Sequence, residues 1–227
     1  MLTEAYSKSD QKEYSNFKVD YLEKNPNLAR QTIEVLDTFQ KYTATYALTD
    51  EMTGLRNKTG FMSKLEDEIL NVKRALKEPD SKGSCIVDMD LRDFKSINDT
   101  YGHLAGDQAL QAAADKLKEV FRENDIIGRL GGDEFAVIMK GTDAISAIEK
   151  TQKLYDAFKG EEGLPVQVTD NDGNKVSINV HMTAAVSCID SSLSADDNMN
   201  LADQGMYEIK KQQHEHFGAS RSGQAFH

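Results

Sequence analysis

The sequence predicts an α+β sheet domain preceded by a helical segment. Short apolar runs bounded by turn residues predict strands at 84–89, 126–130 and 135–139. A hairpin signal at 171–174 joins two further strands, at 166–169 and 176–186. Apolar residues that recur every three or four positions predict helices over 61–76, 110–121, 143–158 and 201–211. Helices and strands mixed in this way, with at least one hairpin, are typical of the α+β class.

Residues 1–47 are predicted to form a polar helical segment with a break at Pro26. Its apolar residues fall on one helical face, so the segment either packs on its own domain or pairs with a second copy of the chain. Too few heptads are present to decide between a linker and a dimerising coiled coil. The residues of this face are Tyr14, Phe17, Tyr21, Leu28, Val35, Phe39, Tyr42 and Tyr46. At the other end, residues 216–227 are expected to form a flexible tail.

The composition limits the classes of partner. With 38 acidic and 27 basic residues, the chain carries a net charge of −11, which argues against broad contact with nucleic acid or an anionic membrane. No apolar stretch is long enough to span a membrane, and the N-terminus lacks the features of a signal peptide. We therefore expect a cytoplasmic protein. Cys85 and Cys188 each lie in an apolar run and are predicted to be buried, reduced thiols.

Three acidic residues, at two places in the sequence, stand out as candidate metal ligands. Asp133 and Glu134 follow a Gly-Gly turn between two predicted strands. Neighbouring carboxylates repel one another unless they are solvated or bound to a cation. Asp90 lies at the end of the 84–89 strand, where sheet proteins often place ligands. If the fold brings Asp90 beside Asp133, the pair supplies the hard oxygen ligands that Mg²⁺ prefers.

Three separated motifs stand out in the sequence: residues 50–58 (DEMTGLRNK), residues 90–103 (DLRDFKSINDTYGH) followed by Gly106 and Asp107, and residues 131–135 (GGDEF). Together they resemble the GGDEF family of diguanylate cyclases. In that family they are similar, in this order, to the segment that opens the domain, the substrate motif and the signature. The resemblance covers residues 48–215. It implies a fold like a nucleotidyl cyclase or polymerase palm, with a central, largely antiparallel sheet flanked by helices.

The resemblance implies an enzyme that condenses two GTP into cyclic di-GMP and two pyrophosphates. Asp90 and Asp133 would bind Mg²⁺, with Mn²⁺ as a second possible ion, through their carboxylates, and Leu91 through its carbonyl. Asp133 and Glu134 would be the catalytic residues, Glu134 by binding metal or activating the 3′-hydroxyl. Because each protomer holds one GTP, catalysis would require a homodimer.

The same resemblance assigns the substrate contacts. Asn98 and Asp107 would read guanine, because an amide both donates and accepts hydrogen bonds and a carboxylate accepts from N1–H and N2–H. Lys95 and Lys210 would hold phosphates as point charges. The backbone at Asp93 and Phe94 would face the phosphates, and His214 stands where an Arg often contacts the triphosphate.

A second, inhibitory site is implied by Arg122 and Asp125. They precede the signature at the spacing at which family members bind the product, cyclic di-GMP. Arg can fork onto a phosphate or a guanine edge, and Asp can accept from guanine.

At two positions, Arg92 and His214, the sequence departs from the family pattern, and alternative functions therefore stay open. Arg92 replaces a frequent second acid, and His214 carries only partial charge near neutral pH. The main alternative is therefore a catalytically inactive GGDEF domain that acts as a receptor for GTP or cyclic di-GMP. A third is a nucleotidyl cyclase of other specificity, which Asn98 and Asp107 disfavour because a carboxylate repels the acceptor N1 of adenine.

Overall fold

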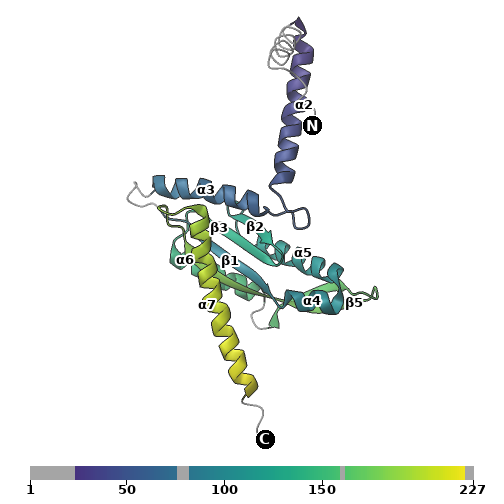
Figure 1. The fold of residues 1–227 in the computed structure, drawn as a ribbon, viewed down its shortest axis with the longest axis vertical. Coiled ribbons are helices and arrows are strands. Elements are labelled where there is room, and N and C mark those ends of the chain that lie inside the picture. Colours follow the sequence, from purple (N-terminus) through teal and green to yellow (C-terminus); the bar gives the residue numbers. More distant parts are fainter. Residues whose placement is uncertain (1–23, 76–81, 159–161, 223–227) are drawn as a thin grey trace, which may run out of the picture. The chain divides into compact units, whose positions relative to one another are not determined.

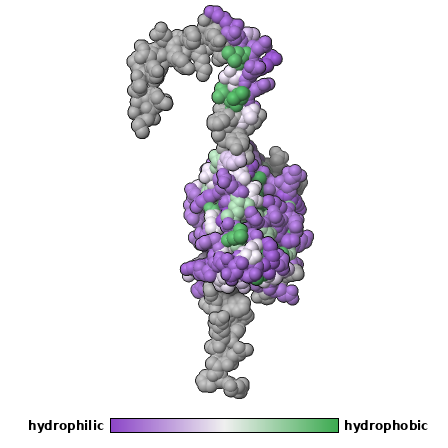
Figure 2. All heavy atoms as spheres, turned by 90° about the vertical axis from the view of Figure 1, so that its right-hand side faces the viewer, coloured by the Kyte–Doolittle hydropathy of each residue, from purple (hydrophilic) through white to green (hydrophobic). Residues whose placement is uncertain are grey.

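The computed structural model describes residues 24–75, 82–158 and 162–222, and the chain divides into two compact units, Met1–Ala47 and Leu48–His227. The described part of the first unit contains helix α2 (Pro26–Ala47). Leu28, Val35 and Tyr46 are 42%, 67% and 52% exposed, so the apolar face of this helix stays open, and Figure 2 shows apolar residues on its surface. Tyr14, Phe17 and Tyr21, and the side chains of Phe39 and Tyr42, lie outside the described residues.

The second unit is built on a five-stranded sheet in the order β2-β3-β1-β5-β4, with every neighbouring pair antiparallel (Figure 1). The strands are β1 (Cys85–Arg92), β2 (Ile126–Gly131), β3 (Glu134–Met139), β4 (Leu164–Thr169) and β5 (Lys175–Cys188). This confirms the α+β class and the largely antiparallel central sheet. Within the described residues, no helix is long and apolar enough to cross a membrane.

Helices cover both faces of the sheet. One core joins α3 (Lys58–Ala75) and α7 (Ala195–Ser222) to one face, and the other joins α5 (His103–Val120) and α6 (Ala144–Ala157) to the opposite face. A short helix, α4 (Phe94–Tyr101), follows β1 directly and packs on α5. The sequence does not predict α4, because Ile97 is the one residue of this polar segment that is buried.

Strand β1 lies between the two cores. Its side chains alternate between the faces of the sheet. Val87, Met89 and Leu91 belong to the core under α5 and α6, whereas Ile86 belongs to the core under α3 and α7. Asp88 and Asp90 have the same parity as Ile86, so β1 directs both carboxylates toward the α3 and α7 side.

Three features of the structure were not predicted from the sequence. Ile145 and Ile148 of α6 are 73% and 60% exposed, because the helix turns Ala147 and Leu154 toward the core instead. Cys85 is buried as predicted, but Cys188 is exposed, since β4 pairs with β5 only from Lys175 to Val180 and leaves the other end of β5 uncovered. Both thiols are free, with their Sγ atoms 3.0 Å apart. Helix α7 continues to Ser222, further than the predicted helix over 201–211, and the flexibility of residues 216–227 stays a prediction.

Candidate active site

The two acidic motifs meet where β1 ends beside the start of β3. Asp90 is paired with Glu134 across the antiparallel ladder. One residue on, the backbone N–H of Leu91 donates to the carbonyl oxygen of Asp133 at 3.2 Å. The structure therefore brings together the four residues that the sequence selects as metal ligands. Asp90 is half-buried, with 20% of its side chain exposed, and Glu134 is exposed.

A tight turn presents Asp133. Gly131 pairs with Glu134, so the turn contains Gly132 and Asp133 alone. Gly132 adopts a φ of 50°, in the left-handed region that favours glycine. The turn is held by Arg129, whose Nε donates to the Gly132 carbonyl at 2.9 Å and whose Nη1 lies 3.1 Å from Asp50 Oδ2. Sequence reasoning missed Arg129, because a basic residue inside a strand run carries no distinctive pattern.

Charge at this site is balanced by one lysine from α7. Lys210 Nζ lies 2.9 Å from Asp90 Oδ2. Burial raises the pKa of Asp133, and the charge of Asp90 raises it further, whereas Lys210 and Arg129 act in the opposite direction. The carboxylates of Asp90 and Asp133 are thus close enough to repel each other, and an added cation would relieve that repulsion.

Asp88 extends the acidic cluster toward the core. Its residue is 6% exposed, and burial raises its pKa to about 7, with further contributions from the charges of Asp203 and Glu134. The sequence analysis did not select Asp88. The signal was present, because residues i and i+2 of a strand lie on one face and Asp88 is two positions before Asp90.

The oxygen donors suit a divalent cation that keeps part of its coordination for water and substrate. Among the described residues, no group of three or more His, Cys, Asp or Glu side chains is placed to enclose a metal ion. Mg²⁺ needs fewer, since it is commonly held by one or two carboxylates together with substrate phosphates. The carboxylates of Asp90 and Asp133, with the Leu91 carbonyl, are donors of this hard type. The residues present therefore fit Mg²⁺.

The chain after β1 forms a loop that opens onto the first turn of α4. Asp93 caps this helix with a φ of 57° and is the one non-glycine residue with positive φ among the described residues. Its carbonyl accepts the N–H of Ser96 at 2.8 Å, which closes the first turn. Phe94 is half-buried, and Lys95 is exposed. The N-terminus of a helix and an adjacent lysine favour anions.

The corner between α4 and α5 brings the predicted guanine contacts together. Gly102 joins the two helices with a φ of 91°. A Cβ added at Gly106 would lie 2.0 Å from Asn98 Oδ1, so the Asn98 amide rests on the backbone of α5 beside Asp107. Asn98 and Asp107 are both half-buried, which leaves part of each polar group accessible.

The structure describes the contacts of Arg92 but not those of His214, the two residues that depart from the family pattern. Arg92 Nη2 lies 3.1 Å from Nδ1 of His181 on β5, and the buried Nε has no hydrogen-bond partner. The side chain of His214 lies outside the described residues, although α7 includes this position. Its contact with phosphate stays a prediction.

Arg122 and Asp125 form a compact turn between α5 and β2. The Arg122 N–H donates to Asp125 Oδ2, and the Asp125 N–H donates to the Arg122 carbonyl, each at 3.0 Å. Arg122 is exposed and Asp125 is half-buried. The two side chains are therefore held on one loop, with the guanidinium accessible from solvent.

Comparison with known proteins agrees with this arrangement. Residues 47–216 match the family "Diguanylate cyclase, GGDEF domain". The chain is 32% identical over 164 residues to diguanylate cyclase A of Treponema denticola, covering 72% of this chain and 42% of that protein. It is 30% identical over 172 residues to diguanylate cyclase DgcP of Pseudomonas aeruginosa, covering 73% of this chain and 23% of that protein.

A solved structure shows the same fold. The coiled coil and GGDEF domain of DgcB from Caulobacter crescentus, in complex with c-di-GMP, superimposes with a TM-score of 0.71 at 21% identity, covering 84% of this chain and 95% of that one. The chain spans less than half the length of the two curated relatives it matches. The family match extends over the greater part of the sequence, and its signature lies at the turn where the acidic groups converge. The chain belongs to the GGDEF domain family of diguanylate cyclases.

Proposed function

We propose that this chain condenses two molecules of GTP into cyclic di-GMP with release of two pyrophosphates. One observation carries the proposal: Asp90, Asp133 and Glu134 converge beside Lys210, at the point where β1 runs into the N-terminus of α4. Carboxylates for a divalent cation thus lie next to positive groups suited to a triphosphate.

The corner between α4 and α5 supplies a guanine site. Guanine presents N1–H and N2–H donors beside the O6 acceptor, and Asp107 and Asn98 offer the complementary acceptor and amide groups. Their position against Gly106 supports this assignment, since the missing Cβ leaves the Asn98 amide close to the α5 backbone. Adenine presents an acceptor at N1, which the Asp107 carboxylate would repel.

The triphosphate would lie along residues 91–95, where β1 leads into α4. Backbone N–H groups at the start of α4, including those of Asp93 and Phe94, would donate to phosphate oxygens, as helix N-termini commonly do. Lys95 and Lys210 would neutralise the phosphates, and His214 would add a pH-dependent contact. A bound substrate would then compete with Asp90 for Lys210.

Catalysis would consist of positioning and charge stabilisation. The 3′-oxygen of one GTP attacks the α-phosphorus of the other and pyrophosphate leaves; two such reactions close the ring. The exposed Glu134 carboxylate accepts the 3′-hydroxyl proton, and Lys210 stabilises charge on the leaving pyrophosphate. Mg²⁺ or Mn²⁺ held by Asp90, Leu91 and Asp133 would supply Lewis-acid stabilisation at the phosphates.

A homodimer completes the reaction, because one domain holds one substrate and the ring needs two. The open apolar face of α2 supports pairing of two copies through the N-terminal unit. Arg122 and Asp125 would bind the cyclic product and inhibit the enzyme, and the accessible guanidinium on their loop supports this role.

Incubation of the chain with GTP and Mg²⁺ tests the proposal. We expect cyclic di-GMP and pyrophosphate to accumulate, and Glu134→Gln to reduce the rate at least about 100-fold. Glu149→Gln, an exposed site on α6, is the matched control and should leave the rate unchanged. Binding of GTP without turnover at any protein concentration would instead favour a catalytically inactive receptor. This is the second candidate function, because Arg92 places a positive charge where the family often has an acid.

Product inhibition needs a separate assay. Added cyclic di-GMP should slow the unmodified chain, and Arg122→Ala should relieve that inhibition while initial rates persist. Equal inhibition of both proteins would exclude the loop at Arg122 as the inhibitory site.

A further inference from the structure

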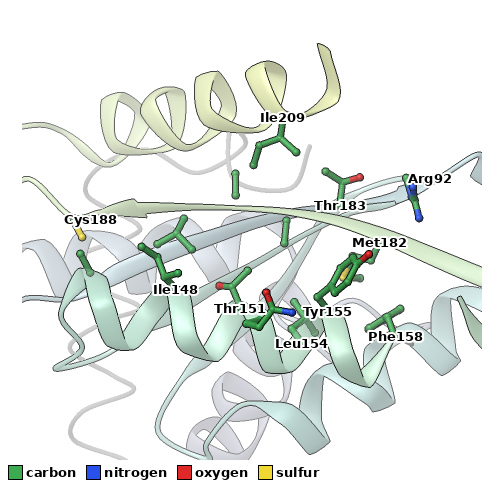
Figure 3. A pocket seen from close by; sticks show the side chains of 15 residues that line it. Arg92, Ile148, Thr151, Leu154, Tyr155, Phe158, Met182, Thr183, Cys188 and Ile209 are labelled. Atoms are coloured by element: carbon green, nitrogen blue, oxygen red, sulfur yellow. The ribbon is translucent and has the colours of Figure 1, made fainter. Parts of the chain in front are cut away.

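A cavity of about 500 Å³ lies along the edge of β5, between α6 on one side and Ile209 of α7 on the other, and no residue of the acidic cluster lines it (Figure 3). This volume is within the range of small-molecule sites, roughly 300–1,000 Å³. Its walls are mainly apolar. They include Ile148, Leu154 and Phe158 of α6 and its C-terminal end, and Met182, Ala184 and Val186 of β5.

The strand that lines the cavity has an uncovered edge. Strand β4 pairs with β5 from Lys175 to Val180, and β1 pairs with the part from His181 to Cys188. In the described residues, that second part has a strand neighbour on the β1 side alone. Ile148 and Tyr155 border this region while 60% and 42% exposed, so apolar surface remains open to solvent.

One end of the cavity carries a positive charge. Arg92 lies there in Figure 3, at the opposite end from Cys188. Because Arg92 pairs with His181 and Cys85 pairs with Cys188, the two ends are seven residues apart along β5, or about 23 Å. None of the described residues that line the cavity is acidic.

The guanidinium of Arg92 has no acidic partner among the described residues. Its Nε is buried without a partner, which is uncommon for a buried polar atom. Its Nη2 contacts His181 Nδ1 at 3.1 Å, and no described carboxylate forms an ion pair with it. A carboxylate is the ligand that a guanidinium fork binds best.

We propose that this cavity binds a linear monocarboxylate with an apolar chain, of the medium-chain fatty acid class. The carboxylate binds the Arg92 guanidinium, and the chain lies along β5 toward Cys188 between Val186 and Ile148. The mainly apolar walls and the single positive end favour this class over dianionic ligands. The inference does not depend on the cyclase reaction.

Isothermal titration with dodecanoate, below its micelle concentration, tests the proposal on the full chain. We expect saturable binding at one site, with affinity rising about fourfold per methylene from octanoate to dodecanoate. Dodecyltrimethylammonium has the same chain with a cationic head, and acetate has the head without the chain. Both should bind at least about tenfold more weakly. Equal affinity for dodecanoate and dodecyltrimethylammonium would overturn the role of Arg92, and non-saturable uptake of both would overturn the site.

Two pairs of variants locate the ligand. Arg92→Gln removes the charge and should weaken dodecanoate binding at least about tenfold. Ile148→Asp places a carboxylate at the wall, whereas Ile145→Asp makes the same change three residues away on α6, at a position that does not line the cavity. Both isoleucines are exposed, so both variants should fold. Loss of binding in Ile148→Asp with full binding in Ile145→Asp supports the proposal, and unchanged binding in Ile148→Asp overturns it.

Discussion

Asp90 and Glu134 face each other across the β1–β3 ladder, and Lys210 of α7 lies 2.9 Å from Asp90. Directly opposed like charges destabilise an antiparallel pair. The chain therefore holds a local arrangement that needs positive charge, and α7 supplies one such charge from a distant part of the sequence. A cation and a polyphosphate can take over that role together when the substrate binds.

Lys210→Gln should lower GTP turnover more than it lowers the stability of the fold. The side chain is partly exposed, so its ion pair contributes little to folding. Loss of its charge removes stabilisation of phosphate and of the charge that develops during transfer, for which we expect about a 10- to 100-fold fall in kcat/KM. Lys211→Gln is the matched control, an exposed neighbour on the same helix. Equal rates for the two variants would remove Lys210 from the active site.

Gly106→Ala should weaken GTP binding by displacing Asn98. The new Cβ would lie 2.0 Å from Asn98 Oδ1, so the amide has to move. We expect at least about a tenfold rise in KM for GTP, because a misplaced amide loses its hydrogen bonds to guanine. Gly205→Ala in α7 is the control: its nearest neighbour is Ala185 Cβ at 3.6 Å, and alanine should stabilise the helix by up to about 1 kcal/mol. An unchanged KM in Gly106→Ala contradicts the guanine assignment.

Asp88 should make stability fall as the pH rises. Burial raises its folded pKa to about 7, above the ordinary value of 3.8. A carboxyl with a raised folded pKa contributes stability below its unfolded pKa, and this contribution is lost as the pH rises from about 4 through 7. Asp88→Asn stays neutral, so its advantage over the unmodified chain should grow with pH, to at most about 4 kcal/mol at pH 8. Urea unfolding at pH 4, 6 and 8, with a chelator present, measures the difference. An advantage that does not change with pH would show that Asp88 titrates normally.

Asp50→Ala should destabilise the domain and loosen the turn that carries Asp133. Asp50 accepts from the Thr53 N–H at 2.9 Å and lies 3.1 Å from Arg129, which in turn holds Gly132. We expect a loss of about 1–3 kcal/mol in thermal or urea unfolding near pH 7. Burial acts to raise the pKa of Asp50, but the bonds from Thr53 and the charge of Arg129 outweigh it and leave the pKa lowered. The loss should therefore shrink as the pH falls from about 4 through the lowered pKa of the native carboxyl.

Asp67→Ala provides the comparison for Asp50. Asp67 pairs with Lys64 at 2.8 Å, but 60% of its side chain is exposed. Its removal should leave the free energy of unfolding almost unchanged, because a solvent-exposed ion pair contributes little to stability. Equal effects of the two substitutions would mean that the Asp50 contacts add nothing specific to the turn.

The sequence predicted the strands well, because their signals are local. The run at 84–89 is buried on both faces, and the Gly-Gly turn is flanked by strands on each side, so apolar content and glycine were enough. Helix α4 was not predicted, because its residues are mostly polar and its position depends on packing against α5. The exposure of Ile148 could not be read from spacing either, since the turn of α6 toward the core is set by Ala147 and Leu154.

Contacts between residues far apart in the sequence were harder to predict than the identity of the site residues. Asp90, Asp133 and Lys210 were each selected from the sequence, but the ion pair between Asp90 and Lys210 depends on how α7 crosses the sheet. The contact of Arg92 with His181 and the support of Gly132 by Arg129 depend likewise on strand register. Local patterns specify which side chains are chemically apt, whereas the three-dimensional arrangement decides which of them meet.

The alternation along β1 limits how this sequence can change. Val87, Met89 and Leu91 fill one core, while Ile86, Asp88 and Asp90 have the opposite parity. A one-residue insertion between Ile86 and Asp90 would reverse the parity of every later position in the strand. Asp90 would then point into the apolar layer beneath α5, and Met89 or the inserted residue would take its place beside Lys210. Substitutions can therefore be tolerated along this strand more readily than any change in its length.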